Sequence, residues 1–247
     1  MSDLTILATS GGYAPGHRTR LALGPLVHHA ADLAGVEGTP RVCHLGTAGG
    51  DQTWFHAELD EAARVAGFAM SHLSLFSMPN VDDVEAHLRD HDVVWVGGGS
   101  VVNLLAVWRA HGLPEILRSV GGSGVVLAGV SAGSLCWHVG GPTDSFGPDL
   151  RPVTDGLAFV PYGNGVHYDA EPGRRPLLHR LVAEGTLPTS YATDDGVGLV
   201  YRGGRLVEAV TEIRDAAAWV VRRERDADGA ATAVEGRIVP RVLSGAR

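Results

Sequence analysis

The sequence predicts an α/β protein with a mostly parallel sheet and helices on both faces. Three observations lead to this fold class: short apolar runs that stop at glycine or serine, helical segments between those runs, and a high glycine content. The 247 residues include 34 glycines, and 45% are hydrophobic while only 19% are charged. Short apolar runs are typical of strands buried on both faces of a sheet, and their alternation with helices predicts right-handed crossovers between parallel strands. We expect residues 1–247 to form a single domain.

The first half of the chain supplies the strands and helices of this sheet. Apolar runs predict five buried strands, at residues 4–8, 41–45, 71–76, 92–96 and 124–130. Apolar residues at helical spacing predict helices at 19–34 and 101–111, and further helices are expected at 134–139 and 176–184. Pro25 is expected in the first turn of its helix or at a break. Ligands bind at the carboxyl ends of such strands, so the site is expected near Gly46, Gly99 and Ser131.

Beyond residue 190 the pattern changes to short strands joined by turns. Strands are predicted at 196–201, 205–210, 216–221 and 236–242, which would extend or cap the sheet as a C-terminal β extension. The polar segment 222–232 is predicted to be a mobile hairpin loop.

The composition excludes several classes of protein. The net charge is −8 and no dense cluster of lysine and arginine offsets it, so nucleic acid is not expected as a partner. No apolar run approaches the roughly 20 residues of a membrane span, and the N-terminus has no basic segment followed by an apolar one. We therefore expect no membrane partner and a cytoplasmic location. Cys43 and Cys136 are expected to be reduced and buried. A homodimer remains one option for the oligomeric state.

The first chemical motif is Gly-Val-Ser-Ala-Gly at 129–133, between a predicted strand and a predicted helix. A sharp turn of this kind lifts a serine hydroxyl into solvent, and Gly129 and Gly133 leave room for it. The start of the helix also directs backbone N–H groups toward developing negative charge. Ser131 is thus a candidate nucleophile; the alternative is that the small residues only let the helix pack closely on the strand.

The second motif is Gly-Gly-Gly-Ser at 97–100, which also follows a strand. The N–H groups of Gly99 and Ala132 could together form an oxyanion hole. A phosphate-binding loop is the rival interpretation, but the segment lacks the Gly-Lys-Ser/Thr ending of a P-loop.

A serine nucleophile needs a base, and His167 is the first candidate among the 12 histidines. It lies in a glycine-rich segment that follows an apolar run, as expected for a loop that delivers a side chain to a site. His138 is the nearest competitor in sequence. It lies about two helical turns after Ser131, and the rise of about 10 Å makes direct contact improbable.

Together these motifs resemble the peptidase E and cyanophycinase group of serine peptidases, whose fold is similar to that of class I glutamine amidotransferases. The resemblance covers about residues 40–215 and rests on the order and spacing of Val96-Gly-Gly-Gly99, the 129–133 motif and Val166-His167-Tyr168. It implies a cofactor-free and metal-free acyl-enzyme mechanism on small peptides, of the dipeptidase or aminopeptidase type. In it, Ser131 is the nucleophile, His167 is the base, and Gly99 and Ala132 donate to the oxyanion.

The acid that would complete the triad is open between several aspartates. The resemblance favours Asp144, which lies shortly after the helix that follows Ser131. Asp169 is the second choice because it lies two residues after the histidine, as in the related amidotransferases. Asp149 and the pair at 194–195 are weaker candidates, since aspartates in such positions are more often turn or cap residues.

Substrate-binding residues are predicted at Ser100, Arg174 and Arg175. Ser100 stands where peptidase E typically has an asparagine, so strict specificity for aspartyl peptides is in doubt. Either arginine could bind a substrate carboxylate through paired hydrogen bonds, or both could lie on the exposed start of a helix. The rival functions are a non-catalytic binding or sensor protein on the same scaffold, and an amidohydrolase or esterase acting on a small molecule.

Overall fold

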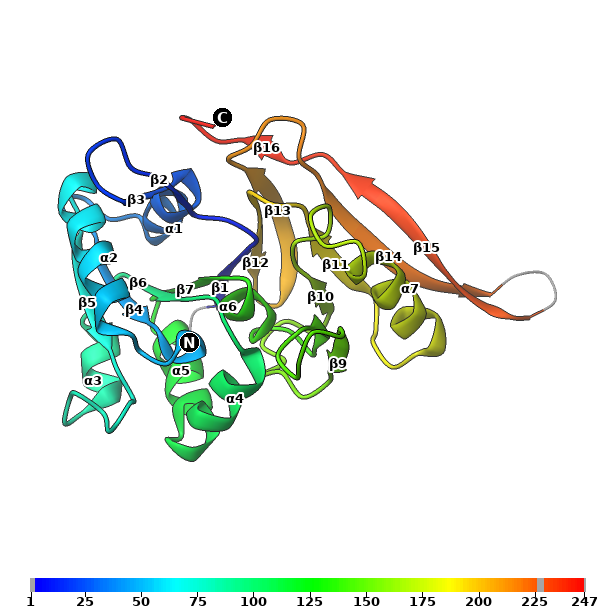
Figure 1. Ribbon diagram of the computed structural model, residues 1–247, viewed down its shortest axis with the longest axis horizontal. Coiled ribbons are helices and arrows are strands. Elements are labelled where there is room, and N and C mark those ends of the chain that lie inside the picture. Colours follow the sequence, from blue (N-terminus) through cyan, green and yellow to red (C-terminus); the bar gives the residue numbers. More distant parts are fainter. Residues whose placement is uncertain (1–2, 226–228, 247) are drawn as a thin grey trace.

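A computed structural model describes residues 3–225 and 229–246, and its main element is an eight-stranded sheet (Figure 1). The strand order is β16-β13-β12-β1-β7-β6-β4-β5. Five neighbouring strands run parallel, and β12 and β13 continue the sheet in antiparallel pairing. The eight strands are β1 (Thr5–Thr9), β4 (Arg41–Leu45), β5 (Ala69–Leu73), β6 (Val93–Val96), β7 (Val126–Val130), β12 (Val197–Arg202), β13 (Arg205–Thr211) and β16 (Arg241–Val242). The predicted α/β class with a C-terminal β extension is confirmed.

Helices cover both faces of this sheet because its central strands, such as β6 and β7, are apolar and buried on both sides. One buried cluster joins α1 and α2 to one face, and a second cluster joins α3 to α6 to the other. The helices are α1 (Pro25–Ala34), α2 (Thr53–Ala66), α3 (Val84–Arg89), α4 (Val101–Ala110), α5 (Leu113–Gly122) and α6 (Ala132–Leu135), and a 3-10 turn, η1, spans Thr47–Gly49. None of the helices in 3–225 and 229–246 combines the length and apolarity needed to cross a bilayer.

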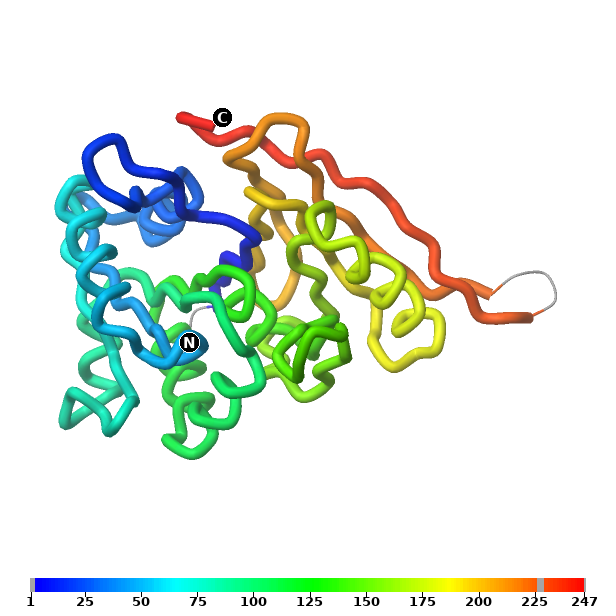
Figure 2. Tube along the Cα trace, viewed as in Figure 1, coloured from blue at the N-terminus to red at the C-terminus, as the bar shows by residue number. Residues whose placement is uncertain are grey.

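A second sheet of four strands, in the order β10-β11-β14-β15, lies beside the first (Figures 1 and 2). Helix α7 (Arg174–Glu184) packs on it through buried leucines such as Leu178 and Leu181. The strands are β10 (Gly163–Gly165), β11 (Ser190–Thr193), β14 (Ala218–Arg225) and β15 (Ala231–Ile238), and two small hairpins are formed by β2 (Tyr13–Pro15) with β3 (Leu21–Leu23) and by β8 (Gly141–Thr143) with β9 (Arg151–Val153).

Several predicted boundaries differ from the structure. The helix predicted at 19–34 begins only at Pro25, which occupies the first helical position, and residues 21–23 form β3. The strand predicted at 236–242 is two strands, interrupted next to Pro240, which has no N–H to donate. The hairpin loop predicted at 222–232 is wrong for most of its length, because β14 and β15 occupy it on both sides; residues 226–228 lie outside the described part.

Candidate active site

The site forms where the parallel strands of the large sheet end. Strand β7 ends at Val130, and its register places Gly129 opposite Val96 at the end of β6. The glycine segment 97–99 therefore leaves the sheet next to Ser131. On the other side, the Ser131 N–H donates to the Thr9 carbonyl at the end of β1, at 3.0 Å.

Ser131 lies in a strained turn between β7 and α6. Its φ of 57° and ψ of −111° fall outside the regions that L residues commonly adopt. A Cβ atom on Gly133 would lie 2.2 Å from the Val96 carbonyl oxygen, and one on Gly129 would lie 2.5 Å from the Gly133 carbonyl oxygen. Both glycines are therefore required for the close approach of strand and helix, as the sequence predicted.

A continuous hydrogen-bonded chain links Ser131 to a histidine and an aspartate. The Oγ of Ser131 lies 3.0 Å from Nε2 of His167, and Nδ1 of the same ring lies 2.5 Å from Oδ1 of Asp195. His167 and Asp195 follow β10 and β11, which are neighbouring parallel strands of the second sheet. The carboxyl ends of two parallel strands thus bring the histidine and the aspartate together.

Asp144, which the sequence favoured as the acid, does not contact His167. Its carboxylate lies 3.8 Å from the Arg174 guanidinium, on another wall of the site. Asp144 follows the short hairpin strand β8, whereas the carboxylate on His167 comes from the end of β11.

The other aspartates considered from the sequence have different partners. Asp169, the second choice, accepts a hydrogen bond from the Asp195 N–H at 2.9 Å and so supports the backbone of the aspartate that contacts His167. The Asp194 carboxylate accepts from the Trp219 indole and the Ala217 N–H, and its burial raises its pKa. Asp149 lines a neighbouring surface hollow, which shares Asp144 and Glu171 with the cavity at Ser131, and is not itself among the residues that line that cavity.

Ser10 is a site residue that the sequence analysis missed. It directly follows β1, and its hydroxyl oxygen accepts from the His167 N–H at 3.1 Å. The same hydroxyl lies 2.6 Å from the Thr193 hydroxyl at the end of β11. Ser10 therefore ties the histidine segment of the second sheet to the large sheet.

His138 is a structural residue and does not contact Ser131, as expected, but the helix predicted at 134–139 ends at Leu135, so His138 lies beyond α6. It is fully buried, with Nδ1 at 2.9 Å from the Ser134 carbonyl oxygen and Nε2 at 3.2 Å from the Tyr201 hydroxyl. Burial lowers the pKa of His138 to about 4.

This pKa predicts that His138 makes the protein acid-sensitive. An exposed histidine in the unfolded chain binds a proton near pH 6.5, whereas the folded ring binds one only near the pKa of about 4. Stability should therefore fall as the pH drops below about 6.5, and His138 should account for about 2 kcal/mol between pH 7 and pH 5. Urea titrations of the wild type and His138→Gln at both pH values would measure this difference. An equal loss of stability in both proteins would contradict it.

A cavity of about 360 Å³ opens on the Ser131–His167 pair. It is lined by Gly99, Ser100, Ser131, Asp144, Ser145, His167, Glu171 and Arg174. Ser100 is thus placed at the cavity, where its side chain caps α4 by accepting from the Asn103 N–H at 3.2 Å.

The glycine segment 97–99 is positioned to offer free N–H groups to this cavity. The Gly97 N–H is used by the Leu45 carbonyl, while those of Gly98 and Gly99 donate to no acceptor in the described part of the chain. Gly98, which the sequence analysis did not single out, lies closer to Ser131 than Gly99 does. A Cβ atom on Gly98 would lie 3.4 Å from the Ser131 Cβ. Across from it, Ala132 is the first residue of α6, so its N–H lies outside the hydrogen bonds of that helix.

A model of peptidase family S51 matches residues 6–209 of the chain. The chain belongs to this family. The match includes both sheet ends that carry Ser131, His167 and Asp195, and it confirms the resemblance to the peptidase E group that the motifs indicated. The chain is a serine peptidase.

Similar proteins agree with this assignment. The S51 peptidase is 40% identical over 182 residues to the uncharacterized peptidase YgaJ of Bacillus subtilis (strain 168), a match that covers 74% of this chain and 78% of the relative. Its fold is similar to that of a peptidase from an acI-B1 Actinobacterium, with a TM-score of 0.68, 16% identity and coverage of 97% and 96% of the two chains. It is also similar to a candidate peptidase E of Listeria monocytogenes EGD-e, with a TM-score of 0.60, 17% identity and coverage of 83% and 98%.

The two predicted arginines of the S51 peptidase have different environments. Arg174 lines the cavity, but its guanidinium donates to the Glu171 carboxylate at 2.7 and 3.1 Å and to the Pro142 carbonyl at 2.8 Å. Arg175 is not among the lining residues. Its guanidinium lies over the rings of Tyr168 and Trp219, at 4.7 and 4.4 Å from their centroids.

Proposed function

We propose that this serine peptidase hydrolyses short peptides that have a free amino end, with Ser131, His167 and Asp195 as its catalytic triad. The observation that carries the proposal is the hydrogen-bonded chain of 3.0 and 2.5 Å from the serine hydroxyl through the imidazole to the carboxylate. The strained turn at Ser131 acts as a nucleophile elbow. The proposed mechanism requires no cofactor.

In the proposed reaction, His167 Nε2 takes the proton of Ser131 as the hydroxyl attacks the peptide carbonyl. Asp195 holds the imidazole with its N–H at Nδ1 and stabilises the imidazolium that forms. The proton then passes to the leaving amine, and water hydrolyses the acyl-enzyme by the same route. The N–H groups of Ala132 and of Gly98 or Gly99 would donate to the oxyanion.

The charges around the cavity favour a substrate with a cationic end. Asp144 and Glu171 place two carboxylates beside the Ser131–His167 pair, and Arg174 is the one arginine among the lining residues. The Asp144 side chain is 63% exposed, and its contact with Arg174 is long, so it is available to a ligand. We propose that these carboxylates bind the amino group of the peptide.

An acidic side chain is a less favoured ligand than the sequence indicated. Arg174 is only 3% exposed and already forms charge-assisted hydrogen bonds with Glu171. A substrate carboxylate would have to displace Glu171 and would approach Asp144 as well. A preference for aspartyl peptides therefore requires a rearrangement of this cluster.

The test of the triad is labelling by a serine-directed phosphonate, followed by identification of the modified peptide. We expect labelling at Ser131 in the wild type and none in Ser131→Ala or His167→Gln. Labelling would also separate an enzyme from a non-catalytic binding protein on the same scaffold. Hydrolysis of p-nitrophenyl acetate without hydrolysis of any dipeptide would instead favour an esterase.

The amino-end proposal predicts that acetylation of the substrate lowers activity. Loss of a charge-assisted hydrogen bond costs about 1.5–3 kcal/mol, so kcat/KM for N-acetyl-Ala-Leu should be about 10- to 100-fold lower than for Ala-Leu. In Asp144→Asn this difference should shrink, and the KM for Ala-Leu should rise. Asp149→Asn, whose carboxylate lies outside the cavity, is the matched control. Equal rates for both peptides in the wild type would remove the proposal for the amino end and leave the triad untouched.

A further inference from the structure

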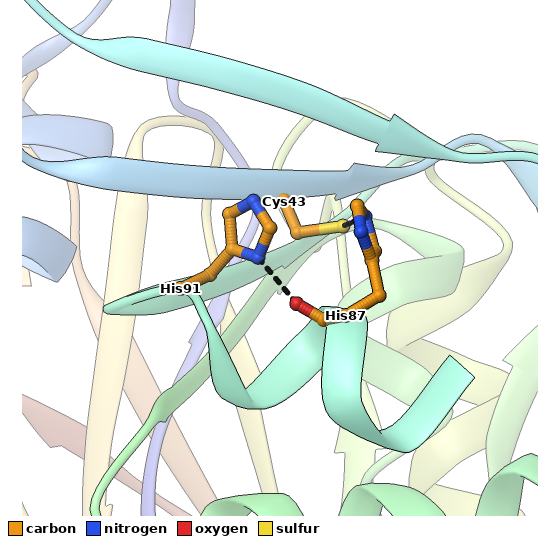
Figure 3. A group of neighbouring side chains, drawn as sticks. All are labelled: Cys43, His87 and His91. Carbon is orange, nitrogen blue, oxygen red and sulfur yellow. Dashed lines mark hydrogen bonds between the residues drawn. The ribbon is translucent and has the colours of Figure 1, made fainter. Parts of the chain in front are cut away.

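A cysteine and two histidines converge at the edge of the large sheet, on the face covered by α3 (Figure 3). Cys43 of β4 is paired in register with Ser71 of β5, so both side chains point to the same face. His87 lies in the last turn of α3 and His91 follows one turn later. One ligand atom from each of Cys43, His87 and His91 lies within 4.8 Å of the others.

The distance between Cys43 and His87 fits a tetrahedral zinc site. With Zn–S of about 2.3 Å and Zn–N of about 2.0–2.1 Å, sulfur and nitrogen ligands lie about 3.5–3.6 Å apart. The Cys43 Sγ lies 3.6 Å from His87 Nε2. The Ser71 Oγ lies 3.5 Å from the same nitrogen, where a fourth ligand would be found. The two imidazole rings are tilted by 56° and are therefore not stacked.

His91 already has the orientation of a metal ligand. Its Nδ1 lies 2.8 Å from the His87 carbonyl oxygen, to which it donates (Figure 3). This fixes the tautomer and leaves a lone pair on Nε2, which accepts from the Ser71 hydroxyl at 2.7 Å. Histidines that bind metals commonly donate their other N–H to a backbone carbonyl in this way.

Cys43 is fully buried, and burial raises the pKa of its thiol to about 12. Without a cation the group therefore remains a neutral thiol. An ion that enters from the side of the half-buried histidines would replace the thiol proton, which leaves to solvent, and would gain a thiolate ligand.

We propose that Cys43, His87 and His91 bind a zinc ion, with the Ser71 hydroxyl or a water molecule as the fourth ligand. The ligand set of one sulfur, two imidazoles and one oxygen suits zinc. Such an ion would join α3 to β4 and would stabilise this edge of the sheet. It is separate from the proposed triad and does not depend on it.

A second group lies on the opposite face, where His44 of β4 and His72 of β5 meet His56 of α2. It fits a single ion less well. The rings of His56 and His72 are stacked, with centroids 4.1 Å apart and planes within 14° of parallel, so their in-plane lone pairs cannot meet at one point. We use this group as a control.

Cobalt titration of the purified, metal-free protein tests the proposal, because a thiolate bound to Co²⁺ gives a charge-transfer band in the near ultraviolet. We expect this band at one equivalent of Co²⁺ in the wild type, in Cys136→Ser and in His56→Gln. It should be lost in Cys43→Ser, with folding checked by circular dichroism. Absence of the band in the wild type, or its persistence in Cys43→Ser, would overturn the proposal.

A second measurement keeps the test valid if Cys43→Ser does not fold. Zinc affinity, measured by competition with a chromogenic chelator, should fall at least about 10-fold in His91→Gln and remain unchanged in His111→Gln, which alters an exposed histidine outside the group. Zinc at about 100 times its Kd should also raise the Tm of the wild type by about 5–10 °C. Equal affinities in the two histidine variants would show that zinc binds elsewhere.

Discussion

Replacing Ser131 with alanine is expected to lower kcat by about 10⁶-fold, because removal of a serine nucleophile abolishes the whole acyl-enzyme route. The fold should be unaffected. Within the described residues the Ser131 hydroxyl forms a hydrogen bond with His167 alone, so loss of the hydroxyl leaves the other contacts of the turn in place. The measurement is peptide hydrolysis with thermal unfolding of the same samples.

Ser145→Ala is the matched control for this variant. Ser145 lines the same cavity, but its hydroxyl accepts from the Val101 N–H at 3.0 Å and does not contact His167. The Ser145 hydroxyl also lies 2.8 Å from the Thr143 hydroxyl, and neither neutral contact involves Ser131 or His167, so kcat should stay within about 10-fold of the wild type. A Ser131→Ala enzyme as active as Ser145→Ala would reject Ser131 as the nucleophile.

Asp195→Asn is expected to lower kcat by about 10⁴-fold, since an amide in place of the carboxylate can hold the imidazole in the wrong tautomer and cannot stabilise the imidazolium. Asp169→Asn should have a smaller effect, because Asp169 acts through the backbone of Asp195. Asp144→Asn should change KM more than kcat. Steady-state kinetics of the three variants would show which substitution lowers kcat most. If Asp144→Asn were the inactive variant, the contact between His167 and Asp195 would not be the catalytic one.

The sequence singled out Ser131 and His167, which lie 3.0 Å apart in the structure, because each lies in a local pattern. The serine motif follows an apolar strand, and the histidine follows a glycine-rich segment. Both patterns can be recognised without knowing which strands pair.

The acid could not be found in this way because its position depends on the pairing of β10 with β11. Strand β11 has the sequence Ser-Tyr-Ala-Thr and strand β10 has Gly-Asn-Gly, so neither is an apolar run. The available signal was the pair Asp194-Asp195 directly after a short segment with β-branched and aromatic residues. An acidic pair at the carboxyl end of a strand is a stronger candidate for the third triad residue than an acidic residue in a turn.

The strands of the fold were likewise predicted where a local apolar pattern marks them, and missed where only pairing with a distant strand does. Strands buried on both faces, such as β6 and β7, were predicted because every residue in them is apolar or glycine. The outer half of the two-stranded ribbon of β14 and β15 was missed because it pairs exposed polar residues, for example Glu224 with Thr232. Figure 1 shows this ribbon extending away from the rest of the molecule, where little burial is available to mark it in the sequence.

In the proposed triad, Ser131 comes from the large sheet, whereas His167 and Asp195 come from the second sheet. Ser10 joins the two sheets through its hydrogen bonds to His167 and Thr193. The rate of catalysis should therefore depend on how the two sheets are aligned, as well as on the side chains of the proposed triad. Partial opening of the smaller sheet would separate base from nucleophile while the helices of the larger one remain folded. In a denaturant titration, activity should disappear at a lower concentration than helical circular dichroism, and Ser10→Ala should widen the interval between the two transitions.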